Sequence, residues 1–175
     1  MSAAPSARIR LARPEELPVV GEITVAAYAP FTLGPDDPYL AQLRDAAARA
    51  EQAELWVAVD EETGQVLGSV TTCPPGSPWR EVSRDGEGEF RMLSVSPAAQ
   101  GRGIGTSLVE HVLAHYRTAG AHAVVLCSLP DMTAAHRLYA RHGFTRLPER
   151  DWDVHPGKPL WSFGRDLDTH LQGDA

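Results

Sequence analysis

The sequence predicts an α+β domain built on one mixed sheet, and three observations support this prediction. Several strand-like segments precede a single glycine-rich loop, and about one strand–helix–strand unit follows it. The strand-like runs 55–59 and 66–73 are joined by Glu62-Thr63-Gly64, which indicates a turn between antiparallel strands. Residues 123–126 are nearly all apolar, as in a strand that lies within a parallel part of a sheet.

The other elements follow from apolar spacing and from residues that favour helix ends. Pro14-Glu15-Glu16 predicts a helix start, since proline suits the first helical position and acidic side chains suit the positive end of the helix dipole. The expected helices cover about residues 14–27, 39–52, 104–120 and 133–142. The expected strands are 8–11, 55–59, 66–73, 90–95, 123–126, 144–147 and 160–167, with a loop over 74–88.

Length and composition restrict the classes of protein to which the chain can belong. We expect one domain over residues 8–167, between an N-terminal extension, 1–7, and a C-terminal tail, 168–175. The formal net charge of −7 argues against a nucleic-acid partner. The first residues do not form a signal peptide, and no apolar run is long enough for a bilayer, so we expect a cytoplasmic protein without a membrane partner. Cys73 and Cys127 lack metal-binding spacing and read as buried free thiols.

The most informative segment is the hexapeptide Gln100-Gly101-Arg102-Gly103-Ile104-Gly105, between an expected strand and an expected helix. Its three glycines remove Cβ atoms that would keep a ligand away from the backbone. The first N–H groups of a helix have no intrahelical acceptor, and they carry a partial positive charge. The segment therefore predicts a loop that binds a pyrophosphate group.

Three classes of ligand use a loop of this kind. A P-loop for nucleoside triphosphates needs a lysine and a hydroxyl residue after the last glycine, and the sole lysine of the chain is the distant Lys158. A dinucleotide fold needs a third glycine where this chain has Thr106, and it needs more βαβ units than the remaining chain can supply. The third class is coenzyme A.

Two segments carry a resemblance to the GNAT family of N-acetyltransferases. The hexapeptide resembles the Gln/Arg-x-x-Gly-x-Gly/Ala signature of the family, and Leu93-Ser94-Val95-Ser96-Pro97 is similar to the strand end that precedes it. Downstream, residues 134–144 resemble a second signature, Ala-x-x-Leu-Tyr-x-x-x-Gly-Phe. The order of expected elements is also similar to the family over about residues 8–167.

The resemblance implies an acyl-CoA N-acyltransferase fold in which two central parallel strands splay apart and helices flank the sheet. It also implies that acetyl-CoA is the co-substrate, that its pantetheine lies in the gap between the strands, and that no metal is needed. Arg102 is expected either as a solvated loop residue or as a ligand of a CoA phosphate. The implied cofactor-binding residues are Leu93, Ser94, Val95, Gln100, Gly101, Arg102, Gly103, Ile104, Gly105 and Thr106.

The implied reaction is direct transfer of an acetyl group to a primary amine of a small molecule or peptide. Tyr139 falls on the family tyrosine that protonates or hydrogen-bonds the CoA sulfur, a role that suits a phenol at neutral pH. A backbone N–H at or near Val95 is expected to stabilise the oxyanion. Glu89, and as an alternative Glu87, is the candidate base, although a strand-end acid can equally be a solvated side chain.

The chain departs from the family pattern at Met132, where many members have an asparagine, and at Cys127, where some have a glutamate. These departures keep two alternatives open, a catalytically silent CoA-binding sensor and a transferase that uses another acyl-CoA. His111 and His115 are four residues apart but lack an evident third metal ligand. A homodimer remains possible from the sequence.

The acceptor is not identified by the sequence. We expect it to be shaped by the helices before Gln52, by the 74–88 loop and by the last hairpin, where Trp79 and Trp152 could line a pocket. The acidic residues of the loop weakly favour a cationic amine, and they are Glu81, Asp85 and Glu87.

Overall fold

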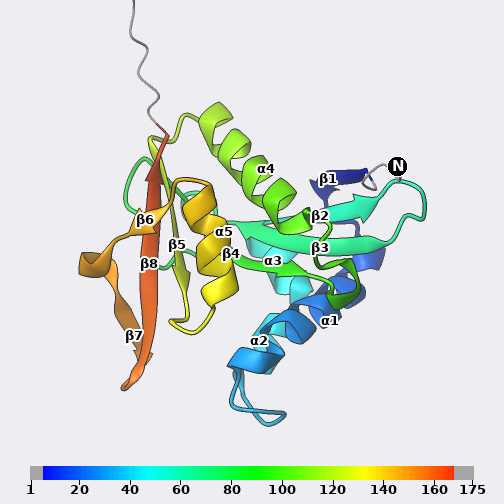
Figure 1. The fold of residues 1–175 in the computed structure, drawn as a ribbon, viewed down its shortest axis with the longest axis horizontal. Coiled ribbons are helices and arrows are strands. Elements are labelled where there is room, and N and C mark those ends of the chain that lie inside the picture. The colour runs from blue at the N-terminus through cyan, green and yellow to red at the C-terminus, as the bar shows by residue number, and fades with distance from the viewer. Residues whose placement is uncertain (1–5, 168–175) are drawn as a thin grey trace, which may run out of the picture.

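An eight-stranded mixed sheet runs through the protein, in the order β1-β2-β3-β4-β5-β8-β6, with β7 paired to β8 (Figure 1). The computed structural model describes residues 6–167. The strands are β1 (Ala7–Leu11), β2 (Glu54–Asp60), β3 (Val66–Thr72), β4 (Glu87–Val95), β5 (Ala123–Ser128), β6 (Thr145–Arg146), β7 (Trp152–His155) and β8 (Lys158–Asp166). The helices are α1 (Leu17–Tyr28), α2 (Tyr39–Arg44), α3 (Ala46–Gln52), α4 (Ile104–Thr118) and α5 (Thr133–Arg141).

The expected domain, residues 8–167, lies within the described residues. Ala7 already belongs to β1, one residue before the expected start of the domain. The rest of the expected extension, apart from Ser6, and the whole expected tail, 168–175, lie outside the described residues. Within residues 6–167, no helix is both long and apolar enough to cross a membrane.

The pairing of the strands confirms the predicted mixed sheet. Strands β1 to β4 pair antiparallel in chain order, and β2 and β3 form the hairpin that the turn residues indicate. The one parallel pair joins β4 to β5, on either side of α4, and β5 then pairs antiparallel with β8. The strand, α4 and the next strand therefore form the expected βαβ unit at the centre of the sheet.

The two central strands part along their length, as the resemblance implies. Residues 87–89 of β4 pair with residues 123–125 of β5, and no pairing follows although both strands continue. The segments that do not pair with each other are 90–95 of β4 and 126–128 of β5, and they lie at the carboxyl ends of these strands. This end of the sheet therefore carries backbone groups that are free to bind a ligand.

A bulge lies in the part of β4 that pairs with β3 but not with β5. Thr71 of β3 is opposite Arg91, but Ser69 is opposite Ser94, so two steps along β3 correspond to three steps along β4. Met92 has a φ of 52°, and it is the only residue other than glycine with a positive φ among residues 6–167. A bulge of this kind bends a strand and leaves a residue outside the ladder, which turns the end of β4 away from regular pairing.

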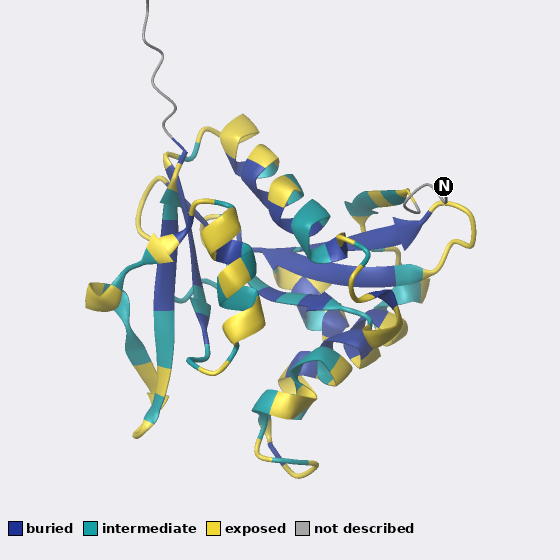
Figure 2. Ribbon diagram, in the orientation of Figure 1, coloured by how far each residue is buried: buried dark blue, intermediate teal, exposed yellow. Residues whose placement is uncertain are grey.

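Helices cover both faces of the sheet, α4 and α5 on one face and α1 to α3 on the other (Figure 1). The apolar stripe that the sequence predicts for α4 is buried, and it is formed by Ile104, Leu108, Val112 and Tyr116. Figure 2 shows that the helices are buried toward the sheet and exposed on their outer sides. Burial of these apolar faces is the main driving force that holds the layers together.

Some elements differ from the prediction. The expected helix 39–52 is broken at Asp45, whose side chain accepts the N–H of Ala48 and caps α3. Strand β4 begins at Glu87 rather than at residue 90, because the charges of its first residues are paired inside the protein. The turn at residues 156–157 is preceded by an additional strand, β7.

Replacing Gly88 by alanine should strongly destabilise the fold. A Cβ atom at this position would overlap the ring of Tyr116, which lies directly over the strand. We expect the free energy of unfolding to fall by about 3 kcal/mol, the upper range for overpacked cores. Urea unfolding measures this change. Gly105→Ala is the control, since its Cβ would meet only the flexible end of Leu138 at 3.1 Å, and a loss as large in the control would contradict the explanation.

Candidate active site

The glycine loop leaves open space in front of the first turn of α4. Gly101 and Gly103 have φ values of 79° and 76°, and a Cβ atom at either position would have no heavy atom within 4 Å. Gly103 is the N-cap residue, and no side chain caps the helix. The first N–H groups of this 15-residue helix therefore face the open space without an intrahelical acceptor. This arrangement fits an anion of the size of a pyrophosphate.

Gly105 connects the two sequence signatures in space. A Cβ atom at this position would lie 3.1 Å from Cδ2 of Leu138, so the absence of a side chain allows α5 to approach the start of α4. Leu138 directly precedes Tyr139. The packing of the glycine against the leucine therefore fixes the position of the tyrosine relative to the loop.

Arg102 forms an ion pair with a residue of the sheet, so it is not simply a solvated loop residue. Its Nη2 lies 3.0 Å from Oδ2 of Asp60 at the end of β2. Asp60 also accepts the N–H groups of Glu62 and Thr63, and the hydrogen bond from Arg102 is the main reason why the pKa of this carboxyl is lowered. The pair anchors the glycine loop to the β2–β3 turn.

The side chain of Ser94 points into the protein, so only its backbone is available to a ligand. Its hydroxyl lies 3.1 Å from the hydroxyl of Ser69 and 3.3 Å from that of Thr24 on α1. The neighbouring Leu93 and Val95 are half-buried and pack toward the α4 side of the core. The bulged strand is thus fixed on both faces while its edge toward β5 remains unpaired.

The ring of Tyr139 is held by aromatic neighbours, while its hydroxyl has no hydrogen-bond partner among residues 6–167. The ring packs edge-on against Phe90 and Phe144, with centroid distances of 5.8 and 5.9 Å. Burial raises the pKa of Tyr139 well above its ordinary value. The hydroxyl is therefore a neutral donor across the physiological pH range and is not engaged by the protein.

On the other face of the sheet, two tyrosines and an ion pair lie near the point where β4 and β5 part. Burial raises the pKa of Tyr28, and the hydroxyls of Tyr39 and Tyr139 add to this rise. Arg91 of β4 pairs with Glu81 of the preceding loop, with 2.8 Å between Nε and Oε1. Tyr28, Tyr39 and Arg91 are not among the site residues that the sequence predicts. The position of Arg91, two residues after Glu89 and so on the same face of a strand, is the one signal in the sequence that points to it.

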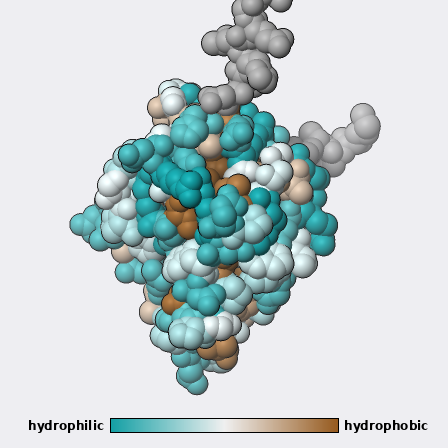
Figure 3. Space-filling model, turned by 90° about the vertical axis from the view of Figure 1, so that its left-hand side faces the viewer, coloured by the Kyte–Doolittle hydropathy of each residue, from teal (hydrophilic) through white to brown (hydrophobic). Residues whose placement is uncertain are grey.

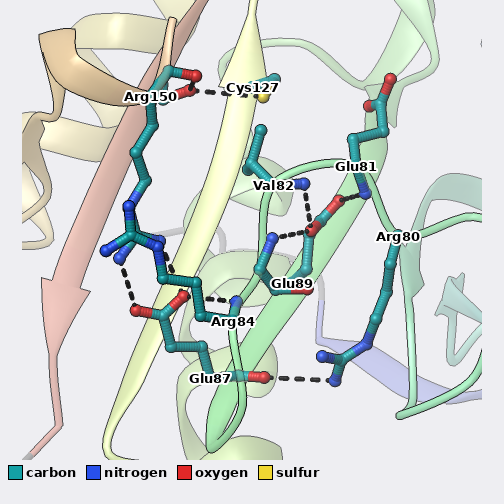
Figure 4. A network of polar contacts seen from close by, with 10 residues as sticks. Arg80, Glu81, Val82, Arg84, Glu87, Glu89, Cys127 and Arg150 are labelled. Carbon is teal, nitrogen blue, oxygen red and sulfur yellow. Dashed lines mark hydrogen bonds and ion pairs between the residues drawn. The ribbon is translucent and has the colours of Figure 1, made fainter.

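The two candidate bases are both buried and engaged (Figure 4). The carboxylate of Glu89 accepts three backbone N–H groups from residues 81–83 of the preceding loop. The carboxylate of Glu87 pairs with Arg150 through two hydrogen bonds of 2.7 and 2.8 Å. Two of the acids expected to attract a cationic amine are therefore paired with arginines, Glu81 with Arg91 and Glu87 with Arg150.

Replacing Glu87 by glutamine should lower stability in a pH-dependent way. The hydrogen bond from Arg150 is the main cause of the lowered pKa of Glu87. A lowered folded-state pKa means that the ionised carboxylate stabilises the fold above the unfolded-state pKa of about 4.3. This contribution disappears as the pH falls through the lower, folded-state pKa.

We therefore expect Glu87→Gln to cost about 2 kcal/mol at pH 7, because it leaves the partly buried Arg150 without its counter-ion. The difference from wild type should shrink as the pH falls below about 4. Urea unfolding across pH measures both effects. Asp85→Asn, which changes an exposed acid of the same loop, is the control, and a pH-independent difference for Glu87→Gln would contradict the assignment.

Other candidate residues have packing partners. The indole N–H of Trp152 donates to Sγ of Cys127 at 3.4 Å, and burial raises the pKa of this thiol to about 11. The indole N–H of Trp79, which is buried, donates to Oε1 of Gln52. Cys127 thus remains a thiol at neutral pH, consistent with a packing role.

The histidines on α4 pack against side chains of the sheet. His115 lies 3.0 Å from Glu54, and the rings of His111 and His115 both contact Trp56. Residues 6–167 contain no group of three possible metal ligands. The face viewed in Figure 3 is mostly hydrophilic, with small hydrophobic areas, and the homodimer stays a prediction.

The central strands part, the glycine loop has backbone N–H groups without acceptors, and the Tyr139 hydroxyl has no partner among residues 6–167. Together these features are typical of transferases that bind acyl-CoA. The sequence model of the acetyltransferase (GNAT) family matches residues 20–144. The chain therefore belongs to the GNAT family, as the two signatures predict.

Among curated proteins, the mycothiol acetyltransferase of Cellulomonas flavigena is 36% identical over 121 residues, which is 62% of this chain and 33% of that protein. The chain thus spans about a third of the length of this relative. Among solved structures, yncA of Salmonella typhimurium, with its cofactor acetyl-CoA, is 26% identical with a TM-score of 0.64, over 97% of this chain and 99% of that one. A GNAT acetyltransferase of Brucella melitensis in complex with acetyl-CoA is 29% identical with a TM-score of 0.56, over 81% and 84% of the two chains.

Proposed function

We propose that the chain is an acetyl-CoA-dependent N-acetyltransferase that moves an acetyl group directly to a primary amine of a small molecule or peptide. The observation that carries this proposal is the unengaged Tyr139 hydroxyl, held by packing beside a glycine loop with free amides and a parted strand pair. The acetyl-CoA complexes of two related structures support the choice of donor. The names of the curated relatives support acetyl transfer.

Each residue of the proposed donor site has a distinct task. The backbone N–H groups of residues 101–106 bind the pyrophosphate, with Gln100 and Arg102 flanking it. The unpaired backbone of residues 93–95 binds the pantetheine, and an N–H at or near Val95 stabilises the oxyanion. Tyr139 donates a proton to the sulfur as it leaves.

Glu89 enters this mechanism as a buried carboxylate at the start of the parted strands, and it is the base that the resemblance implies. Its three hydrogen bonds to the loop give it a second task, which is to hold residues 81–83 against β4.

The names of the curated relatives suggest which amines to test as acceptors. Because several relatives are named mycothiol acetyltransferases, deacetylated mycothiol belongs in an amine panel beside amino acids, polyamines, aminoglycosides and peptides with free N-termini. We expect acetyl-CoA to raise the melting temperature of the protein and one panel amine to stimulate release of free CoA. Mass spectrometry of the product then shows whether the acetyl group is on nitrogen.

A CoA-binding sensor on the same fold is the second candidate, favoured by Met132 and Cys127 at positions where the family pattern has other residues. Stabilisation by acetyl-CoA without CoA release for any panel amine would support the sensor. Faster transfer from propionyl-CoA or a longer acyl-CoA than from acetyl-CoA would instead support a different donor. Absence of stabilisation by every acyl-CoA would contradict both candidates.

A further inference from the structure

The carboxylate of Glu89 is occupied by the loop that precedes β4. Oε2 accepts the backbone N–H of Glu81 at 2.7 Å, and Oε1 accepts those of Val82 and Ser83 at 3.0 and 2.7 Å. The side chain is fully buried, with 1% of the residue exposed. Both carboxylate oxygens are thus engaged by backbone N–H groups of the loop. Glu89 is therefore well placed to hold the loop, and neither of its oxygens is left free for an acceptor amine.

One of the residues that Glu89 holds through its backbone N–H, Glu81, is itself an acid. The carboxylate of Glu81 is 16% exposed, and its Oε1 lies 2.8 Å from Nε of Arg91. Figure 4 shows that this carboxylate extends away from Glu89, toward the end of β5 at which Cys127 lies. It therefore reaches the region where β4 and β5 are no longer paired.

Burial raises the pKa of Glu81 above its ordinary value, although Arg91 opposes the rise. A carboxyl group with a raised pKa is a stronger base than an exposed one and is better matched to neutral pH. The titratable and charged groups that face Glu81 come from four elements: Arg91 and Glu89 on β4, Tyr39 on α2, Cys127 on β5, and Cys73 after β3.

Glu81 is also a neighbour of the tyrosines near the parted strands. Tyr39 is close enough to Glu81 for the carboxylate to raise the pKa of Tyr39. The pKa of Tyr28 is in turn influenced by Tyr39, Tyr139 and Arg91. A set of neighbouring side chains thus leads from Glu81 to Tyr139.

We propose that Glu81 accepts the proton of the acceptor ammonium, and that Glu89 is a positioning residue that fixes Glu81 through its backbone N–H. The proposal rests on the transferase function proposed above. An N–H bond of the ammonium breaks, its proton goes to the Glu81 carboxylate, and the electron pair left on nitrogen forms the bond to the acetyl carbon. As the carbon–sulfur bond breaks, the sulfur receives the proton of the Tyr139 hydroxyl. The nitrogen loses its second proton through solvent to Tyr139, and Glu81 returns its proton to solvent.

The kinetic test compares Glu81→Gln, Glu81→Asp and Glu89→Gln, with Glu62→Gln, which changes an exposed acid of the β2–β3 turn, as the control. With the amine that the panel identifies, we expect Glu81→Gln to lower kcat about 100-fold and to remove the acidic limb of the pH profile. Binding of acetyl-CoA should change less than about twofold, and Glu81→Asp should recover part of the rate together with the limb. Glu89→Gln should lower the rate but keep the limb. The opposite result, in which Glu89→Gln loses the acidic limb of the pH profile and Glu81→Gln keeps it, would overturn the proposal and make Glu89 the base.

Two measurements on the free protein need no acceptor. Carbon-13 NMR of glutamate-labelled protein, assigned with Glu81→Gln, should show the Glu81 carboxyl titrating above the ordinary value for glutamate. Amide exchange should show protected N–H groups at residues 81–83 that lose protection in Glu89→Gln but not in Asp85→Asn. A Glu81 carboxyl that titrates at the ordinary value, or loop amides that exchange freely in wild type, contradicts the proposal. A wild-type protein that acetylates no amine but passes both measurements contradicts the transferase function instead.

Discussion

Replacing Gly103 by valine should abolish acetyl-CoA binding while the fold persists. Gly103 is the N-cap of α4 with a φ of 76°, and a Cβ atom added there would have no heavy atom within 4 Å apart from its chain neighbours. We therefore expect the valine side chain to fill the open space in which the loop amides would bind the pyrophosphate. The positive φ adds strain for a β-branched residue and tends to move the loop.

We expect the dissociation constant for acetyl-CoA to rise about 100-fold or more, which corresponds to roughly 2.7 kcal/mol. Titration calorimetry measures the affinity, and thermal unfolding measures the stability. Gly120→Val is a closely matched control, because Gly120 has a φ of 80° and equally open surroundings but follows the far end of the same helix. Equal loss of affinity in both variants would show that strain, and not the loop, causes the effect.

The elements that position this site could be predicted because their signals are local. Glycines after a strand and an apolar stripe at helical spacing predict the loop and α4, and all four stripe residues are buried. The turn 62–64 and the apolar run 123–126 predict the hairpin and the parallel strand, both of which are present. The splayed strands were expected from the family resemblance alone, since no local pattern encodes where two distant strands part.

Long-range partners account for what could not be predicted. Residues 87–89 contain two acids and a glycine, which is typical of a loop, yet they form the paired start of β4. Arg150, which is 63 residues further along the chain, pairs with Glu87. The backbone N–H groups of residues 81–83 engage Glu89 because the loop before β4 folds back over the strand, which sequence spacing does not reveal. The pair of Glu81 with Arg91 is likewise a contact that sequence spacing alone does not reveal.

Replacing Tyr139 by phenylalanine should lower turnover far more than it lowers affinity for acetyl-CoA. The hydroxyl makes no hydrogen bond to residues 6–167, whereas the ring packs against Phe90, Phe144 and Phe163. Phenylalanine keeps this packing, so the fold and the shape of the site should be retained. The substitution removes only a neutral hydrogen-bond donor. Because burial raises the pKa of the Tyr139 hydroxyl, this hydroxyl keeps its proton until a strongly basic group, such as a leaving thiolate, comes within reach.

We expect kcat to fall about 100-fold, with the affinity for acetyl-CoA changed less than about twofold and the melting temperature preserved. Tyr116→Phe is the informative contrast, because the Tyr116 hydroxyl donates to the carbonyl oxygen of Glu89 at 2.6 Å and accepts the N–H of Cys73 at 3.1 Å. Its loss should cost about 1–2 kcal/mol of stability and leave the pH profile unchanged. The two variants therefore separate a tyrosine that holds the start of the parted strands from one that takes part in the reaction between them. Unchanged turnover in Tyr139→Phe would mean that solvent supplies the proton to sulfur, and the free hydroxyl would then need another explanation.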